Sequence, residues 1–185
     1  IIDAIEGGIA EATETLIENA IGTDQDDVID GNNADNEIKG RDGDDVIRGH
    51  KGGDELIGHA GGDVLRGQKG WDSLDGGIGF DRLIGNQGKD TLDGGLGRDT
   101  LIGGLHADTF QFKQAEMNFA DTVVDFEDGV DQFSILSETS RSFSDIGVRQ
   151  NGDDVILELD GVDFAEVRNT LATDIDASDF SFGLA

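Results

Sequence analysis

The chain has 185 residues, and its 41 acidic and 13 basic side chains give a formal net charge of −28. This charge excludes nucleic acid and anionic membrane surfaces as expected partners, because contacts to phosphates need Lys and Arg. No residue is Cys, so disulfides cannot stabilise the fold, and no run approaches the ~20 apolar residues of a membrane span. Only 36% of the residues are hydrophobic, which is low for a packed core. Because the net charge opposes compaction, we expect cations bound at defined places to offset it.

Residues 1–21 contain two apolar segments, 1–5 and 16–21, and lack the basic region of a signal peptide. We expect N-terminal capping strands here, because the open end of a sheet exposes unpaired backbone groups. The first residue is Ile, so we expect the chain to be a fragment or a processed product.

Residues 22–111 consist of ten consecutive units of nine residues. Position one is Gly in every unit, position four is Gly in seven, and position eight is Ile, Leu or Phe. Position six carries an acidic or amide side chain: Asp27, Asn36, Asp45, Asp54, Asp63, Asp72, Asp81, Asp90, Asp99 and Asp108. A fixed period of this kind is the signature of a repeat architecture.

Each unit predicts one turn and one short strand. Glycines at positions one and four permit positive φ, so we expect the first six residues to turn and the last three to form a strand. Two units then make one coil of 18 residues, with the position-eight side chains meeting between two parallel sheets. The predicted fold is an all-β, right-handed parallel β-roll of five coils, a two-sheet solenoid with capped ends.

The position-six carboxylates predict bound calcium. Stacked one coil apart along each edge of the roll, they repel each other, and no basic column offsets them. Ca²⁺ takes six to eight oxygen ligands, including carboxylates and backbone carbonyls, and the glycine turns bring carbonyls close to the same line. The repeat is therefore expected to build a ladder of calcium sites along both edges.

Residues 112–185 lose the nonapeptide period but contain short alternating runs separated by Asp-Gly and Asn-Gly turns. We expect an antiparallel β cap over this segment. The final residues, SDFSFGLA, fit either a C-terminal type I secretion signal or an ordinary apolar strand.

The repeat resembles a known calcium-binding family. Units 76–84, GGIGFDRLI, and 94–102, GGLGRDTLI, match the G-G-x-G-x-D-x-U-x nonapeptide of RTX proteins at every defined position. The segments LIENAIGTDQDDVIDGNNADNEIKG and ADTVVDFEDGVDQFSIL resemble the two flanks of the β-roll in serralysin-type secreted metalloproteases and related type I secretion substrates.

This resemblance implies a ligand set. Each ion lies between two turns one coil apart and is bound by both position-six side chains, by carbonyls at positions two and four of the first turn, and by carbonyls at positions one and three of the second. Five turns per edge imply about eight sites, and the site between Asn36 and Asp54 is in doubt because Asn carries no charge. The implied carbonyls belong to Arg41, Gly43, His50, Gly52, Gly58, His59, Ala60, Gly61, Gly67, Gln68, Lys69, Gly70, Gly76, Gly77, Ile78, Gly79, Gly85, Asn86, Gln87, Gly88, Gly94, Leu96, Gly103 and Leu105.

The resemblance also implies a role. It describes a module of a secreted bacterial protein that folds on binding calcium after type I secretion, with the secretion machinery and an upstream domain of the same polypeptide as partners. No H-E-x-x-H, G-x-S-x-G or phosphate-loop motif occurs, so no enzymatic activity is predicted. Three alternatives stay open: the non-catalytic part of a secreted protease, lipase or epimerase, a polysaccharide-binding module, and an adhesin or ice-binding solenoid.

The two outer faces of the roll are expected to differ. One sheet presents an aliphatic row, Val28, Val46, Val64, Ile84 and Ile102, and the other presents mostly polar side chains such as Glu55 and Thr91. We expect the aliphatic row to be covered by residues 1–21, by the C-terminal cap or by a further domain. The alternative is that these residues serve strand propensity alone. Trp71 and Phe80, at position five of consecutive turns, fit either a partner surface or local packing.

Overall fold

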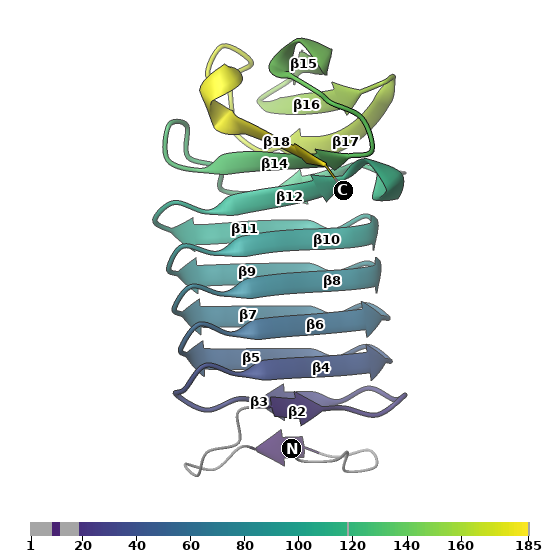
Figure 1. Ribbon diagram of the computed structural model, residues 1–185, viewed down its shortest axis with the longest axis vertical. Coiled ribbons are helices and arrows are strands. Elements are labelled where there is room, and N and C mark those ends of the chain that lie inside the picture. The colour runs from purple at the N-terminus through teal and green to yellow at the C-terminus, as the bar shows by residue number, and fades with distance from the viewer. Residues whose placement is uncertain (1–8, 12–18, 118, 185) are drawn as a thin grey trace.

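The computed structural model describes residues 9–11, 19–117 and 119–184. These residues form an elongated parallel β-solenoid, in which two sheets face each other and antiparallel strands close one end (Figure 1). The described helices are three short 3₁₀ turns, Gln114–Glu116, Phe143–Asp145 and Ala177–Asp179, and no helix in the described ranges is long and apolar enough to cross a membrane.

The strands alternate between the two sheets along the chain. The ten-stranded sheet contains, in spatial order, β1 (Ile9–Glu11), β3 (Val28–Asp30), β5 (Val46–Lys51), β7 (Val64–Lys69), β9 (Arg82–Gln87), β11 (Thr100–Leu105), β13 (Asp121–Val123), β17 (Val162–Val167), β16 (Asp154–Leu159) and β15 (Ile146–Asn151). The eight-stranded sheet contains β18 (Phe180–Leu184), β14 (Gln132–Ser137), β12 (Thr109–Lys113), β10 (Thr91–Gly97), β8 (Ser73–Gly79), β6 (Glu55–Ala60), β4 (Glu37–Asp42) and β2 (Asn19–Ile21).

The coil length and the core agree with the prediction. Within the repeats each residue pairs with the residue 18 positions later, as Leu56 does with Leu74 and Leu65 with Leu83. The position-eight side chains point inward and are at most 2% exposed: Ile29, Ile38, Ile47, Leu56, Leu65, Leu74, Leu83, Leu92, Leu101 and Phe110. Two rows of aliphatic side chains therefore form the core between the sheets, and the prediction of a parallel two-sheet β-roll is confirmed.

The strands are longer than the three residues expected. Most run through positions seven, eight and nine and continue through positions one to three of the next unit, so that only positions four to six form the turn. The expectation failed because Gly at position one and varied side chains at positions two and three indicated a turn, whereas their backbones pair regularly, as His59 does with Gly77.

Position-one glycines serve a different purpose from the one expected. Positive φ occurs at position two, as at His59 with φ 82°, and at position four, as at Gly61 with φ 142°, but at no position-one Gly. Position one must be Gly because of space: a Cβ at Gly76 would lie 2.6 Å from Oδ2 of Asp81 and 2.7 Å from the carbonyl oxygen of Gly94.

The cap continues the roll before it turns antiparallel. β13 and β14 pair in parallel with β11 and β12, with offsets of 22 residues (Thr100 with Thr122) and 23 residues (Thr109 with Gln132). β15, β16 and β17 then form the expected antiparallel strands, while β18 returns to pair in parallel with β14. Aromatic side chains fill this end, and Phe133 stacks on Phe126 with ring centroids 4.4 Å apart.

Two further expectations concern the N-terminal end of the roll and the outer face of the ten-stranded sheet. β1 and β2 extend the two sheets in parallel, and the rest of the expected capping strands, residues 1–8 and 12–18, lies outside the described residues. Among the described residues no element lies across the outer face of the ten-stranded sheet, because β13, β17, β16 and β15 join this sheet as further strands at its end. The cap therefore does not cover this face, and cover by residues 1–21 or by a further domain stays a prediction. Val46, Val64 and Ile84 are partly buried nonetheless, within parallel-paired strands of this sheet.

Candidate metal centres along the two edges

Two columns of buried polar side chains run along the edges of the roll, where the turns connect the sheets. We call them the first column (Asp27, Asp45, Asp63, Asp81, Asp99 and Asp121) and the second column (Asn36, Asp54, Asp72, Asp90, Asp108 and Asp131). Every member is at most 6% exposed. The structure thus brings all ten predicted position-six residues into two lines and adds Asp121 and Asp131 at the cap end.

Each column is held by one repeated hydrogen bond. Oδ1 of a member accepts from the backbone N–H of the preceding member, as Oδ1 of Asp81 does from Asp63 at 2.8 Å. The same bond recurs at 2.8 to 2.9 Å along both columns, up to Asp121 and Asp131. In every Asp that follows another member of its column, Oδ1 is therefore fixed by this hydrogen bond.

The second carboxylate oxygen has no partner in eight members. Oδ2 is buried without a hydrogen bond in Asp45, Asp54, Asp63, Asp72, Asp81, Asp90, Asp99 and Asp108. Burying a charged oxygen without a partner is costly. Oδ2 of Asp81 also lies near the carbonyl oxygen of Gly94, since both border the position of the missing Cβ of Gly76. Oxygens that converge without a donor fit a hard cation such as Ca²⁺.

Backbone carbonyls surround the same gaps between coils. Carbonyls at positions two and four, such as those of His59 and Gly61, closely approach the glycine at the same position in the next coil. Carbonyls at position three already accept one amide hydrogen bond, as Ile78 does from Gly61 at 2.9 Å, and retain a second lone pair. In the described part of the chain no three His, Cys, Asp or Glu side chains cluster as a metal-binding group, so any cation here depends on these carbonyls.

Burial raises the pKa of the interior carboxyls. Desolvation is the largest cause, and it raises the pKa from 3.8 to about 7 for Asp45, Asp54, Asp81 and Asp90. The backbone hydrogen bond to each carboxylate opposes this effect, while the next carboxylates of the column add to it for Asp45 and Asp81. The pKa of Asp121 is raised to about 8, again chiefly by burial. The folded roll without cations therefore disfavours ionised columns.

The first member of each column is satisfied by its own turn. Oδ2 of Asp27 accepts from the backbone N–H of Thr23 at 2.6 Å and from its hydroxyl at 2.9 Å. The side-chain amide of Asn36 donates to the carbonyl of Ala34 at 2.7 Å and to Oδ1 of Asn32 at 3.1 Å. The beginning of each column thus differs from its interior.

Sequence reasoning missed Asp121 and Asp131. Each begins an Asp-x-apolar triplet, DTV and DQF, like the triplets DTL and DTF that begin at Asp99 and Asp108. The triplets were visible, but insertions in the two connecting loops move them out of the nine-residue phase. A search for the triplet without a fixed period would have found both.

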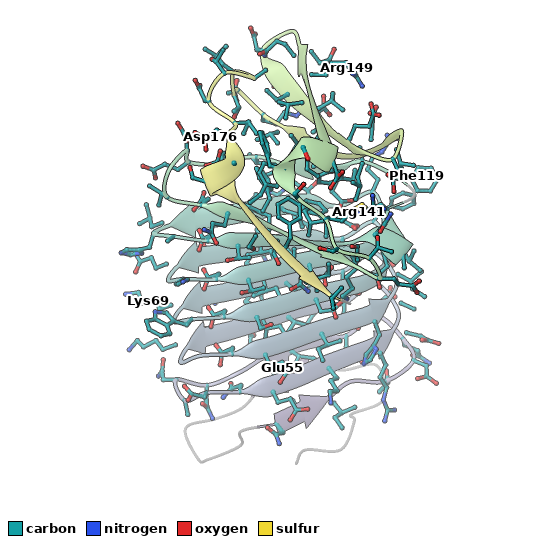
Figure 2. All side chains as sticks on the ribbon, turned by 45° about the horizontal axis from the view of Figure 1, so that its top comes forward. Glu55, Lys69, Phe119, Arg141, Arg149 and Asp176 are labelled. Atoms are coloured by element: carbon teal, nitrogen blue, oxygen red, sulfur yellow. The ribbon has the colours of Figure 1, made fainter. Side chains whose placement is uncertain are left out.

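Other singled-out residues lie on the surface. Trp71 and Phe80 are each 77% exposed, so local packing does not explain them. The position-five acids Asp26, Asp35 and Asp44 are exposed, and each accepts an amide hydrogen bond from the next coil at 2.7 to 2.9 Å. Figure 2 shows Glu55 on the eight-stranded sheet and Lys69 at one edge of the roll.

Comparisons with known proteins give the same family as the repeat. The family model described as RTX calcium-binding nonapeptide repeat (4 copies) matches residues 21–56, 49–83 and 84–111. No curated protein sequence matches the chain.

Two solved structures are similar in outline. One is the extracellular lipase LipA from Serratia marcescens, with 19% identity over 92% of this chain and 41% of the lipase, at a TM-score of 0.44. The other is the AlgE6R3 subunit of the Azotobacter vinelandii mannuronan C5-epimerase, with 20% identity over 93% of this chain and 83% of the subunit, at a TM-score of 0.38. The chain thus spans less than half of the lipase. The assignment depends on the family match and the repeat, and residues 21–111 of this chain belong to the RTX calcium-binding nonapeptide repeat family.

Proposed function

We propose that the repeats form a module that folds when calcium fills the gaps along the two columns. The observation that carries this proposal is the set of eight buried Oδ2 atoms without a partner. Each gap combines two carboxylates with carbonyls from both turns, a donor set that suits Ca²⁺. For the gap between Asp63 and Asp81, the carbonyl ligands are those of His59, Gly61, Gly76 and Ile78.

Calcium binding would supply the free energy that the apo roll lacks. About eight divalent cations would change the formal net charge from −28 to about −12. A site filled at 100 times its dissociation constant adds about 2.7 kcal/mol to the folded state, so eight such sites exceed the ~5–15 kcal/mol stability of a typical domain. We therefore propose a largely disordered chain at low calcium and a folded one at millimolar calcium.

This switch suits a protein that crosses membranes unfolded. We propose that the chain is the calcium-binding part of a secreted bacterial protein, exported by a type I system and folded outside the cell. We propose that residues 1–21 form capping strands, that residues 22–111 form the β-roll, and that residues 112–185 form the β cap and contain the secretion signal. Any enzymatic activity would belong to an upstream domain.

A second candidate function is binding of an anionic polysaccharide. The net charge of −28 opposes it unless bound calcium bridges the two, but the distribution of basic residues favours it. Basic side chains gather on strands of the ten-stranded sheet: Arg48, Lys51, Arg66, Lys69 and Arg82. Exposed Trp71 follows β7 in the adjoining turn. Retention on an anionic polysaccharide column in calcium, lost in Arg66→Ala and Trp71→Ala, would support this function, and elution with the void volume would reject it.

Equilibrium dialysis against calcium tests the main proposal. We expect about eight ions per folded chain, whereas an isolated surface acid such as Asp153 should contribute none. A count of one or zero at millimolar calcium, with the chain folded, would overturn the proposal.

A further inference from the structure

The proposed function leaves open which gaps hold the ions, and the structure assigns them. We propose that the calcium ladder is displaced by one coil toward the cap, so that the last ion on each edge lies beyond the repeats. These ions would occupy the gaps between Asp99 and Asp121 and between Asp108 and Asp131. The first gaps, between Asp27 and Asp45 and between Asn36 and Asp54, would hold no ion. This inference depends on the proposed function.

The gap between Asp99 and Asp121 repeats the backbone hydrogen bond of an interior gap, and its two carboxyl groups also interact with each other. Oδ1 of Asp121 accepts from the N–H of Asp99 at 2.9 Å, and Thr100 pairs with Thr122 in the regular register. Asp99 is 1% exposed, and its Oδ2 has no partner. A Cβ at Gly94 would lie 2.5 Å from this oxygen, which is therefore cradled as Oδ2 of Asp81 is at Gly76.

The carbonyls needed for this site follow from strand pairing. Leu92 and Asp93 pair with Phe110 and Gln111, so β12 takes the place of a further repeat strand. Continuation of this register puts Phe112 and Gln114 in the places of positions one and three. Gly95 and Gly97 supply positions two and four. The nearby cation Lys113 is engaged elsewhere, since its Nζ lies 2.8 Å from Asp93 and 3.5 Å from Glu116.

The gap between Asp108 and Asp131 repeats the interior hydrogen bond, while Oδ2 of Asp131 also accepts from the N–H of Glu127 at 2.9 Å. Oδ1 of Asp131 accepts from the N–H of Asp108 at 2.9 Å, and Oδ2 of Asp108 is buried without a partner. The loop before Asp131 is tied to the last repeat by Asp125, whose two oxygens accept from the N–H groups of Gly103 and Gly104 at 2.9 Å each. Gly104 and His106 supply the carbonyls of positions two and four, and continuation of the Leu101–Val123 register puts Asp125 and Glu127 in the places of positions one and three.

The first gaps differ because the chain fills them with its own donors. Position two of the first two units is Thr23 or Asn32, and their backbone N–H groups donate to Asp27 and Asn36 at 2.6 and 2.7 Å. At the cap end the N–H of Gly104 donates instead to Asp125 at 2.9 Å, and Oδ2 of Asp99 and of Asp108 has no donor. Eight unpartnered oxygens therefore point to eight gaps, and these run from Asp45 and Asp54 to Asp121 and Asp131.

Calcium counting on matched variants tests this assignment. Asp121→Asn and Asp131→Asn keep an oxygen to accept the amide hydrogen bond but lose the charge. At saturating calcium each should bind one ion fewer than the unmodified chain, and the double variant two fewer. Asp27→Asn, a buried change at the other end of the first column, should bind the full number.

The outcomes distinguish a failure of this inference from a failure of the proposed calcium-dependent function. If the unmodified chain binds no calcium, the proposed function fails. If it binds about eight ions, either of two results shows that only the displacement of the calcium ladder is wrong. One is that the Asp121 and Asp131 variants bind the same number of ions as the unmodified chain. The other is that Asp27→Asn loses an ion. Should a cap variant fail to fold, crystals of the unmodified chain grown in calcium decide: an ion beyond Asp99 and none beyond Asp27 supports the proposal, and the reverse overturns it.

Discussion

Replacing Asp63 by Asn should change stability with opposite signs in calcium and in chelator. The oxygen of the new side chain would still accept the N–H of Asp45, as Oδ1 of Asp63 does at 2.8 Å. The new amide group would replace the unpartnered Oδ2 and face the carbonyl of Gly76, since both atoms border the missing Cβ of Gly58. The substitution thus removes one calcium ligand from each of two gaps and, without calcium, removes an uncompensated buried charge.

The magnitudes follow from affinity arithmetic. A tenfold loss of affinity corresponds to about 1.4 kcal/mol, so two weakened gaps lower the free energy of unfolding in calcium by about 3 kcal/mol. Because folding is linked to about eight ions, this loss raises the calcium midpoint of folding about twofold. In chelator, removing an unsatisfied buried charge should stabilise the folded form by about 1–3 kcal/mol.

Asp26→Asn is the matched control. Asp26 also accepts an amide from the next coil, that of Asp44 at 2.9 Å, but it is exposed and has no buried free oxygen. Calcium titrations followed by far-UV circular dichroism, and urea unfolding in saturating calcium, should show the shift for Asp63→Asn alone. Equal shifts for both variants, or a loss of stability for Asp63→Asn in chelator, would refute the reasoning.

Three further predictions concern pH, packing and the cap. Burial raises the folded-state pKa of Asp81 to about 7, above the unfolded value of 3.8, so protonation of Asp81 in chelator favours folding. The β structure in chelator should therefore increase as the pH falls from 7.5 to 4.5. Unchanged circular dichroism spectra over this range would contradict the prediction. Gly76→Ala places a Cβ 2.6 Å from Oδ2 of Asp81 and should lower the melting temperature in calcium, whereas Gly62→Ala, whose nearest neighbour is 3.4 Å away, should not; equal melting temperatures would reject the steric argument. Phe133→Ala removes a fully buried ring that contacts Phe110, Phe126 and Phe180, and it should cost about 3–5 kcal/mol in urea unfolding, with a loss below 1 kcal/mol counting against a packed cap.

The coil and its core were predictable because the same residue type recurs at one position of each nine-residue unit. Leu65 and Leu74 recur in phase and must point inward, so the 18-residue coil and the two-sheet core follow from the spacing alone. The aspartate columns follow for the same reason. Family resemblance was needed only for the carbonyl ligands, because backbone oxygens leave no trace in residue identity.

The remaining features depend on three-dimensional contacts that the period does not encode. The strands extend through positions one to three because backbones pair there whatever the side chains are. Asp121 and Asp131 join the columns because the register resumes after loop insertions, which hide them from a fixed period. Composition alone favoured a covered aliphatic face, but the cap follows the roll axis and leaves Val46 and Val64 in a sheet that no described element covers.

The central claim is that calcium, and not the polypeptide alone, supplies the stability of the roll. Far-UV circular dichroism of the whole chain at pH 7.5, first in excess chelator and then in millimolar calcium, tests it most directly. The account predicts a largely disordered spectrum in chelator and a β-rich spectrum after calcium is added, with no such change on adding sodium to the same ionic strength. A full β signal in chelator, unchanged by calcium, would contradict it.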